Sequence, residues 1–241
     1  MSSCQPADRI IVALDGMDPD SALRFVASIP ELQWVKVGLE LFVAGGPQIV
    51  LALRDLGQRV FLDLKFHDIP ATMAAACRQA AVLGADLITV HASAGSQALA
   101  QAQQAATEAA QQAGREPPCL LGVTVLTSWE EQAFRQQLQV VSSLEQHVSH
   151  LADLAVQAGI GGCVCSPHEL AALRVRHPEP FVLVAPGIRP QGSARGDQAR
   201  VMAPAEALGA GASRLVIGRP ITGSANPPEA FAACCRSLLN G

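Results

Sequence analysis

One ten-residue stretch, FLDLKFHDIP at positions 61–70, places two carboxylates and a lysine at the end of an apolar run. Alternate side chains of an extended strand share a face, so Asp63 and Lys65 are expected on one face and the leucines beside them on the other. Asp68 follows in the loop. Because unpaired charges are costly to bury, the group is expected either to form a structural salt bridge or to take part in chemistry.

The elements around this stretch follow a repeating pattern. Eight short apolar runs alternate with helix-like segments, as in repeated βα units. The runs are Ile10–Asp15, Trp34–Gly38, Val60–Lys65, Leu87–His91, Leu120–Leu126, Gly162–Ser166, Phe181–Ala185 and Arg214–Gly218. The expected helices are Asp20–Ile29, Ile49–Leu56, Thr72–Leu83, Ser96–Ala113, Leu144–Ala158, Pro167–Arg176, Pro204–Leu208 and Pro228–Leu239. Count and length favour an α/β fold, a closed (β/α)8 TIM barrel in a single domain over residues 1–241, although periodicity alone also allows an open doubly wound sheet.

Composition limits the class of protein and its partners. A chain of 241 residues with 49% hydrophobic content can bury a large core. The net charge of −4 and the lack of a basic run argue against nucleic acid or an anionic membrane as a partner. No stretch reaches the roughly 18 to 20 apolar residues of a membrane span, and the N-terminus lacks the apolar core of a signal peptide. We therefore expect a cytoplasmic protein whose seven cysteines are reduced.

Charged and polar residues recur where the expected strands end. The positions are Asp15, Lys36, Asp63, Lys65, Asp68, His91, Thr127, Arg189 and Arg219. Barrel enzymes build their active sites from such strand ends. Lys36 lies between two valines and is expected to point into the barrel, where it needs an anionic neighbour. Gly218 and Arg219 follow the eighth run, and together with Arg189 and Gln198 from the preceding loop they predict a phosphate site.

Six motifs occur in order along the chain: IIVALD, DLKFHDIPATM, VTVLTS, APGIRP, GDQARVM and VIGRPIT. Together they resemble the orotidine 5′-phosphate decarboxylase family over nearly the whole chain. The D-x-K-x-x-D core alone is shared with related sugar-phosphate enzymes, so the longer combination carries the resemblance. Ala203 departs from the threonine frequent in similar bacterial sequences, which is expected to cost only a helix cap.

The resemblance implies conversion of orotidine 5′-monophosphate to uridine 5′-monophosphate (UMP) and CO2, the last step of UMP biosynthesis, in a homodimer without metal or organic cofactor. It implies that Lys65 donates a proton to C6 of the pyrimidine, that Asp63 lies near the departing CO2, and that Lys36 links this pair to the ribose. The further substrate contacts that it implies are Asp15, Asp68, Ile69, Thr72, Thr127, Pro186, Arg189, Gln198, Gly218 and Arg219. Asp68 and Thr72 would reach into the partner subunit's site.

Two other functions fit the same residues. A Mg²⁺-dependent sugar-phosphate lyase could use Glu40 and Asp63 as metal ligands. A module that only binds a phosphorylated ligand would keep the barrel and lack catalysis, but a pure binder gains little from the charged triplet Asp63, Lys65 and Asp68.

Overall fold

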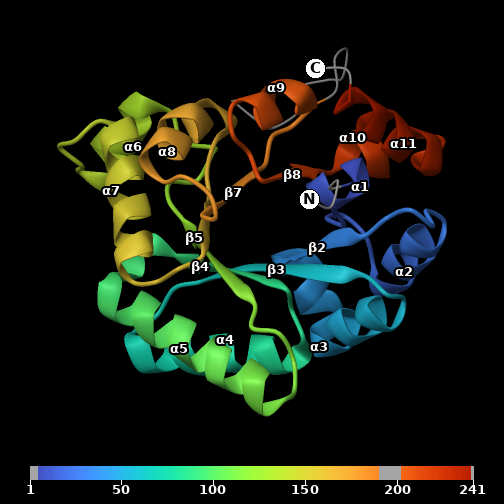
Figure 1. Ribbon diagram of the computed structural model, residues 1–241, viewed down its shortest axis with the longest axis horizontal. Coiled ribbons are helices and arrows are strands. Elements are labelled where there is room, and N and C mark those ends of the chain that lie inside the picture. Colours follow the sequence, from blue (N-terminus) through green and yellow to red (C-terminus); the bar gives the residue numbers. More distant parts are fainter. Residues whose placement is uncertain (1–4, 190–201, 240–241) are drawn as a thin grey trace.

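The computed structural model describes residues 5–189 and 202–239, and these residues form a closed barrel of parallel strands (Figure 1). The strands follow one another around the barrel from β1 to β8, and β1 closes it by pairing with β8, with Ile10 opposite Leu215. Helices surround the strands on the outside (Figure 1). The prediction of a (β/α)8 barrel is confirmed, and the open doubly wound sheet is excluded.

All eight predicted strands are present. They are β1 (Ile10–Ala13), β2 (Trp34–Gly38), β3 (Arg59–Phe66), β4 (Leu87–His91), β5 (Cys119–Val123), β6 (Gly162–Val164), β7 (Val182–Ala185) and β8 (Arg214–Ile217). The residues that follow β1, β5, β6 and β8 were included in the predicted runs, but they lie beyond the ends of these strands. These strands are thus shorter than predicted, and several end just before the polar residues predicted for the site.

The helices are α1 (Pro6–Arg9), α2 (Pro19–Ala27), α3 (Leu39–Asp55), α4 (Pro70–Leu83), α5 (Ser96–Gln112), α6 (Glu131–Leu138), α7 (Leu144–Gln157), α8 (Leu170–Arg176), α9 (Pro204–Gly209), α10 (Arg219–Thr222) and α11 (Pro227–Ser237), with 3-10 turns at Ala92–Ala94 and Pro167–Glu169. Sequence reasoning missed α1, α6 and α10, and it started α3 too late. Helix α3 is kinked at Gly46, which has a φ of 58° and is followed by Pro47. Helix α6 is short and mostly polar, and it buries only Phe134, so its apolar face gives a weak signal in the sequence.

The core has two layers, one inside the barrel and one between the strands and the helices. The inner layer is the cluster Ile11, Ala13, Trp34, Phe61, Leu87, Leu121, Val184 and Val216. The larger outer layer includes Val35 and Val37, while Lys36 between them points inward as predicted. Cys77, Cys163, Cys165 and Cys234 are buried, and none of the cysteines among the described residues forms a disulfide.

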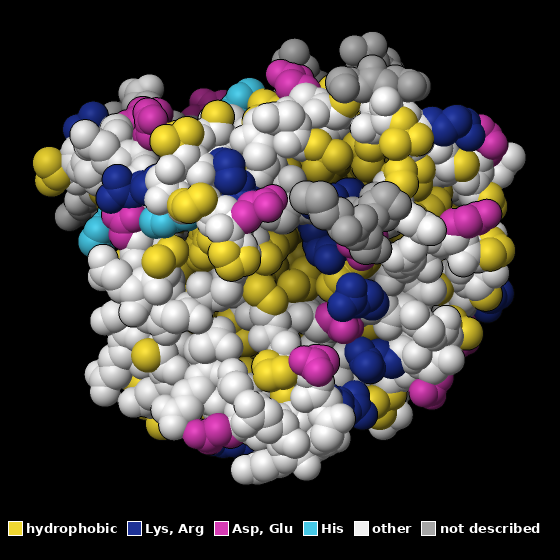
Figure 2. All heavy atoms as spheres, viewed as in Figure 1, with side chains coloured by type: hydrophobic (Ala, Val, Ile, Leu, Met, Phe, Trp, Pro, Cys, Tyr) yellow, Lys and Arg dark blue, Asp and Glu magenta, His cyan; other side chains and the backbone are white. Residues whose placement is uncertain are grey.

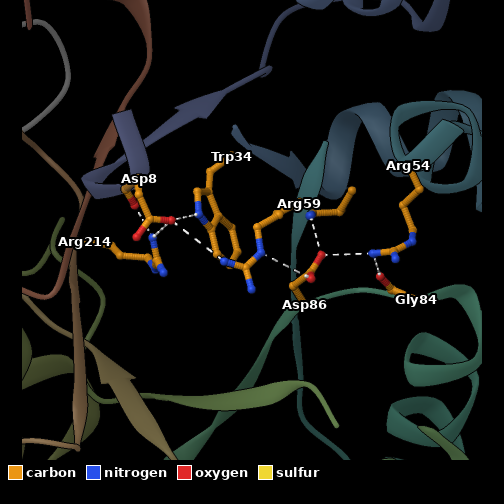
Figure 3. A network of polar contacts seen from close by, with 8 residues as sticks. Asp8, Trp34, Arg54, Arg59, Gly84, Asp86 and Arg214 are labelled. Carbon is orange, nitrogen blue, oxygen red and sulfur yellow. Dashed lines mark hydrogen bonds and ion pairs between the residues drawn. The ribbon is translucent and has the colours of Figure 1, made fainter. Parts of the chain in front are cut away.

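Trp34 at the start of β2 is the centre of a polar network (Figure 3). Its indole Nε1 donates a hydrogen bond of 2.9 Å to Asp8 Oδ1. The guanidinium groups of Arg59 and Arg214 lie 4.5 Å and 4.1 Å from the centre of its ring, which is a cation–π geometry. Arg214 also forms an ion pair of 3.2 Å with Asp8. The network ties β2, β3 and β8 to the first helix at the N-terminal ends of the strands.

Asp86, just before β4, continues this network toward α3. Its Oδ2 accepts hydrogen bonds from the Val60 amide at 2.8 Å and from Arg54 Nη1 at 3.0 Å, and its Oδ1 lies 3.7 Å from Arg59 Nε (Figure 3). Figure 2 shows basic and acidic side chains alternating over β2, β3 and α3 on the face in view. Asp86 therefore joins strands β3 and β4 through side-chain contacts as well as through the sheet.

We predict that Asp86→Ala will lower the free energy of unfolding by about 1 to 3 kcal/mol, because the Val60 amide and Arg54 lose their acceptor. Equilibrium urea denaturation followed by circular dichroism measures this loss. The control is Glu229→Ala, which removes the exposed ion pair with Arg236 and is expected to cost less than about 1 kcal/mol. Equal losses for the two variants would contradict the role given to Asp86.

Candidate active site

Four charged side chains form a continuous chain of ion pairs across the C-terminal ends of β1, β2 and β3. Lys36 Nζ lies 2.9 Å from Asp15 Oδ1 and 3.5 Å from Asp63 Oδ2. Lys65 Nζ lies 2.9 Å from Asp63 Oδ1. The charges alternate in sign, so each buried group has an opposite charge beside it. Asp63 and Lys36 are nearly inaccessible, while Asp15 and Lys65 are more open to solvent.

Asp63 remains ionised inside the barrel because its neighbours outweigh its burial. Burial alone raises the pKa of a carboxyl group. Lys36 and Lys65, together with hydrogen bonds from Lys65 and Thr89, act in the opposite direction, and the net effect lowers the pKa of Asp63 below its usual value. Asp63 is therefore a fixed negative charge that holds two ammonium groups in place.

The backbone at the end of β3 is irregular at the lysine itself. Lys65 has a φ of 52°, in the left-handed region that a residue with a side chain rarely adopts. The pairing of β3 with β4 shifts between Leu62 and Phe66. Such strain costs about 1 to 3 kcal/mol and is most often found at functional sites. The predicted sharing of one face by Asp63 and Lys65 is confirmed, but it depends on this bulge as well as on strand alternation.

Gly38 at the end of β2 leaves room for the ion pair between Asp15 and Lys36. A Cβ atom at this position would lie 2.5 Å from Asp15 Oδ1 and 2.9 Å from Lys36 Nζ. The φ of Gly38 is −88°, which any residue can adopt. The glycine therefore matters for space and not for backbone freedom, because a Cβ atom here would displace the ends of these two side chains.

A cavity of about 480 Å³ opens beside the charged chain. Ala13, Phe61, Val123, Val164 and Val216 give it an apolar lining, and these residues come from five different strands. The predicted site residues that line it are Asp15, Lys36, Asp63, Lys65, Thr127, Pro186, Arg189, Gly218 and Arg219. Its volume lies in the range of small-molecule sites, and its mixed lining of apolar and convergent polar groups is typical of them.

Two arginines lie at the part of this cavity formed after β7 and β8. Arg189 follows β7 and Arg219 begins the short helix α10, immediately after Gly218. Burial lowers the pKa of Arg189, and the nearby positive charge of Arg219 lowers it further. Two guanidinium groups this close to each other favour an anion between or beside them.

Three predicted site residues do not line the cavity. Asp68, Ile69 and Thr72 are exposed, and Asp68 Oδ1 accepts a hydrogen bond of 2.7 Å from the Ile69 amide. Gln198, the remaining predicted contact, lies outside the described residues.

Three polar residues in or near the site make contacts that were not predicted from the sequence. Thr89 on β4 is fully buried and donates a hydrogen bond of 3.0 Å to Asp63 Oδ1. Glu40, considered above as a metal ligand, accepts a hydrogen bond of 2.9 Å from the Gly16 amide. His91 packs against His67, with 5.1 Å between ring centres, and is not among the described residues that line the cavity. Alternation could have found Thr89, since it shares a face of β4 with the inward-pointing Leu87.

Within residues 5–189 and 202–239, no group of three or more His, Cys, Asp or Glu side chains is placed to hold a metal ion. None of the helices in this same part of the chain is both long enough and apolar enough to cross a membrane.

Comparison with known proteins identifies the family. Residues 8–234 match the model of the Orotidine 5′-phosphate decarboxylase / HUMPS family. The chain belongs to this family. It is 69% identical to the orotidine 5′-phosphate decarboxylase of Parasynechococcus marenigrum over 234 residues, which are 97% of this chain and 95% of the relative. It is 56% identical to the corresponding protein of Prochlorococcus marinus over 238 residues, which cover 99% of each chain.

A solved structure agrees with this family assignment. The crystal structure of orotidine 5′-phosphate decarboxylase from Lactobacillus acidophilus superposes with a TM-score of 0.85 at 34% sequence identity, covering 95% of this chain and 98% of that one. The resemblance recognised from the six motifs is therefore confirmed, both in the sequence and in the fold.

We predict that Gly38→Ala will lower kcat/KM by about tenfold or more, because the added methyl group separates Asp15 from Lys36. Steady-state kinetics on orotidine 5′-monophosphate measures the effect. Gly209→Ala is the matched control, since a Cβ atom there meets nothing within 4 Å, and it is expected to leave the kinetics unchanged. Kinetics of Gly38→Ala equal to those of the control would refute the spatial role of Gly38.

Proposed function

We propose that the cavity at the C-terminal end of the barrel is the active site in which this chain converts orotidine 5′-monophosphate to UMP and CO2. The family supplies the reaction, the last step of UMP biosynthesis. The observation that carries the placement is that a single cavity is lined both by the ion-pair chain of β1 to β3 and by the two arginines after β7 and β8. A substrate with a reactive ring and a phosphate needs both.

At the reacting end, Lys65 is the proton donor. The bond between C6 and the carboxylate carbon breaks, CO2 leaves, and the electron pair of that bond remains on C6. The Lys65 ammonium transfers a proton to C6, which gives UMP and neutral lysine, and solvent returns the proton to the lysine. The step balances without a cofactor, and the fixed positive charge stabilises the negative charge that develops at C6.

Asp63 and Lys36 prepare Lys65 for this role. Asp63 Oδ1 accepts from the Lys65 ammonium at 2.9 Å, and its other oxygen is 3.5 Å from Lys36. This arrangement fixes the direction of the Lys65 side chain. The negative charge of Asp63 would lie near the carboxylate of the bound substrate, so departure of CO2 relieves a repulsion between like charges.

At the other end, Arg189, Arg219 and Gly218 bind the phosphate. Arg219 offers a planar fork of donors to the phosphate oxygens. Thr127 and Pro186 line the same cavity and contact the nucleotide. Each tenfold of acceleration needs about 1.4 kcal/mol, so binding energy from the phosphate has to contribute to the rate.

Decarboxylation of orotidine 5′-monophosphate in metal-free buffer containing EDTA, followed by absorbance, tests the proposed function. The wild-type chain is expected to be active, and Lys65→Ala to retain less than about one hundredth of the turnover, because a general acid contributes about 10²-fold or more. Alanine shares the left-handed backbone strain of lysine, so circular dichroism should show an unchanged fold. Loss of wild-type activity with EDTA would favour the metal-dependent lyase, and turnover above about one tenth in Lys65→Ala would refute the role of Lys65.

We further propose that the protein is a homodimer in which Asp68, Ile69 and Thr72 serve the site of the partner subunit. Support comes from their position, since all three are exposed and lie outside the cavity of their own barrel. Ile69, which is 68% exposed, is a large apolar residue that a partner surface would cover.

Mixing inactive Lys65→Ala with inactive Asp68→Ala protein is expected to restore activity. A mixed dimer contains one site with both residues intact, so random exchange in an equal mixture gives up to about a quarter of the wild-type sites. Native mass spectrometry verifies that mixed dimers form. Mixed dimers without any activity would show that Asp68 does not act across the interface.

A further inference from the structure

Thr89 lies in the middle of β4, directly behind the reactive pair. Its side chain is completely buried, and it is not one of the described residues that line the cavity. A hydroxyl group at this depth needs hydrogen-bond partners, and both of its partners are in the proposed active site. Thr89 can therefore influence the reaction only through them.

The two hydrogen bonds of Thr89 have fixed directions. The Lys65 amide donates to Thr89 Oγ1 at 2.9 Å, so the hydroxyl oxygen is the acceptor in this bond. The single hydroxyl hydrogen is then free to be donated to Asp63 Oδ1, at 3.0 Å. Because Asp63 Oδ1 also accepts from Lys65 Nζ at 2.9 Å, the three residues form a closed ring that holds both the backbone and the side chain of Lys65.

The bulge in β3 explains why this hydroxyl is required. Leu62 pairs with Ile88 and Phe66 with Val90, so β3 advances four residues while β4 advances two. The two additional residues of β3 place Lys65 in the left-handed region and turn its amide toward the Thr89 side chain. The hydroxyl group takes the place of a strand carbonyl as the acceptor for this amide.

We propose that Thr89 is a positioning residue for the decarboxylation. Its hydroxyl group holds the Lys65 backbone in the left-handed conformation and turns Asp63 Oδ1 toward the Lys65 ammonium. The inference rests on the proposed function, and it goes further by making the direction of the proton donor depend on a residue that touches no substrate. The phosphate end of the cavity, at Arg189 and Arg219, is formed by other strands and does not depend on Thr89.

The test compares Thr89→Val with Thr89→Ser. Valine has nearly the shape of threonine but neither donates nor accepts, whereas serine keeps the hydroxyl group. For Thr89→Val we expect kcat to fall by about 100-fold, the effect of a misplaced catalytic group, while KM and the dissociation constant of the product UMP stay within about threefold. Thr89→Ser is expected to keep kcat within about fivefold of the wild type.

Thr89→Cys keeps the inference testable if the valine variant does not fold. Its thiol is a weak donor and acceptor of similar size, so a folded cysteine variant is also expected to lose kcat with little change in UMP binding. A folded valine or cysteine variant with kcat within threefold of the wild type would overturn the inference. So would a serine variant as slow as the valine variant, or a parallel loss of UMP binding. Absence of wild-type turnover would instead refute the proposed function, and the inference with it.

Discussion

The buried carboxylate of Asp63 is the group on which the rest of the site depends. It accepts from Lys65 and Thr89 through one oxygen and faces Lys36 through the other. Burial alone would raise the pKa of this carboxyl group. If Asp63 were neutral, Lys65 would lose the carboxylate beside it and Lys36 would keep only Asp15. The ionisation of Asp63 and the positions of both lysines therefore depend on each other. Asp15 extends this dependence to the solvent-exposed end of the ion-pair chain, where it shares Lys36 with Asp63.

The barrel separates the residues that stabilise it from those of the proposed active site. At the N-terminal ends of the strands, Trp34, Asp8 and Asp86 tie strands and helices together through side-chain contacts. Above them, Phe61 and its neighbours fill the interior, so the cavity has a closed floor. A rigid lower half allows the upper half to hold a strained lysine, because the surrounding strands leave the bulge no lower-energy alternative.

Much of the fold and part of the site could be predicted from local sequence. Strands of a parallel barrel are buried on both faces, so they appear in the sequence as short apolar runs. The alternation of side chains within β2 correctly predicted that Lys36 points inward. The unpredicted helix α6 is mostly polar, and its place depends on the packing of Phe134. The roles of Thr89 and Gly38 were missed because they depend on residues distant in the sequence. Thr89 contacts a lysine 24 positions earlier, and Gly38 leaves space for the side chain of Asp15, which follows β1.

The proposed reaction needs a cavity with two different ends, and the closure of the barrel provides it. The strand order puts β8 beside β1, so Gly218 and Arg219 come close in space to Asp15, although they are about 200 residues apart along the chain. In the proposed reaction, a phosphate held by Arg189 and Arg219 would fix one end of the nucleotide, and the length of the substrate would then determine where C6 lies relative to Lys65. Because Lys65 is itself held at its backbone and at its ammonium group, the distance between donor and C6 is set from both sides, and binding energy at the phosphate can lower the barrier at the ring.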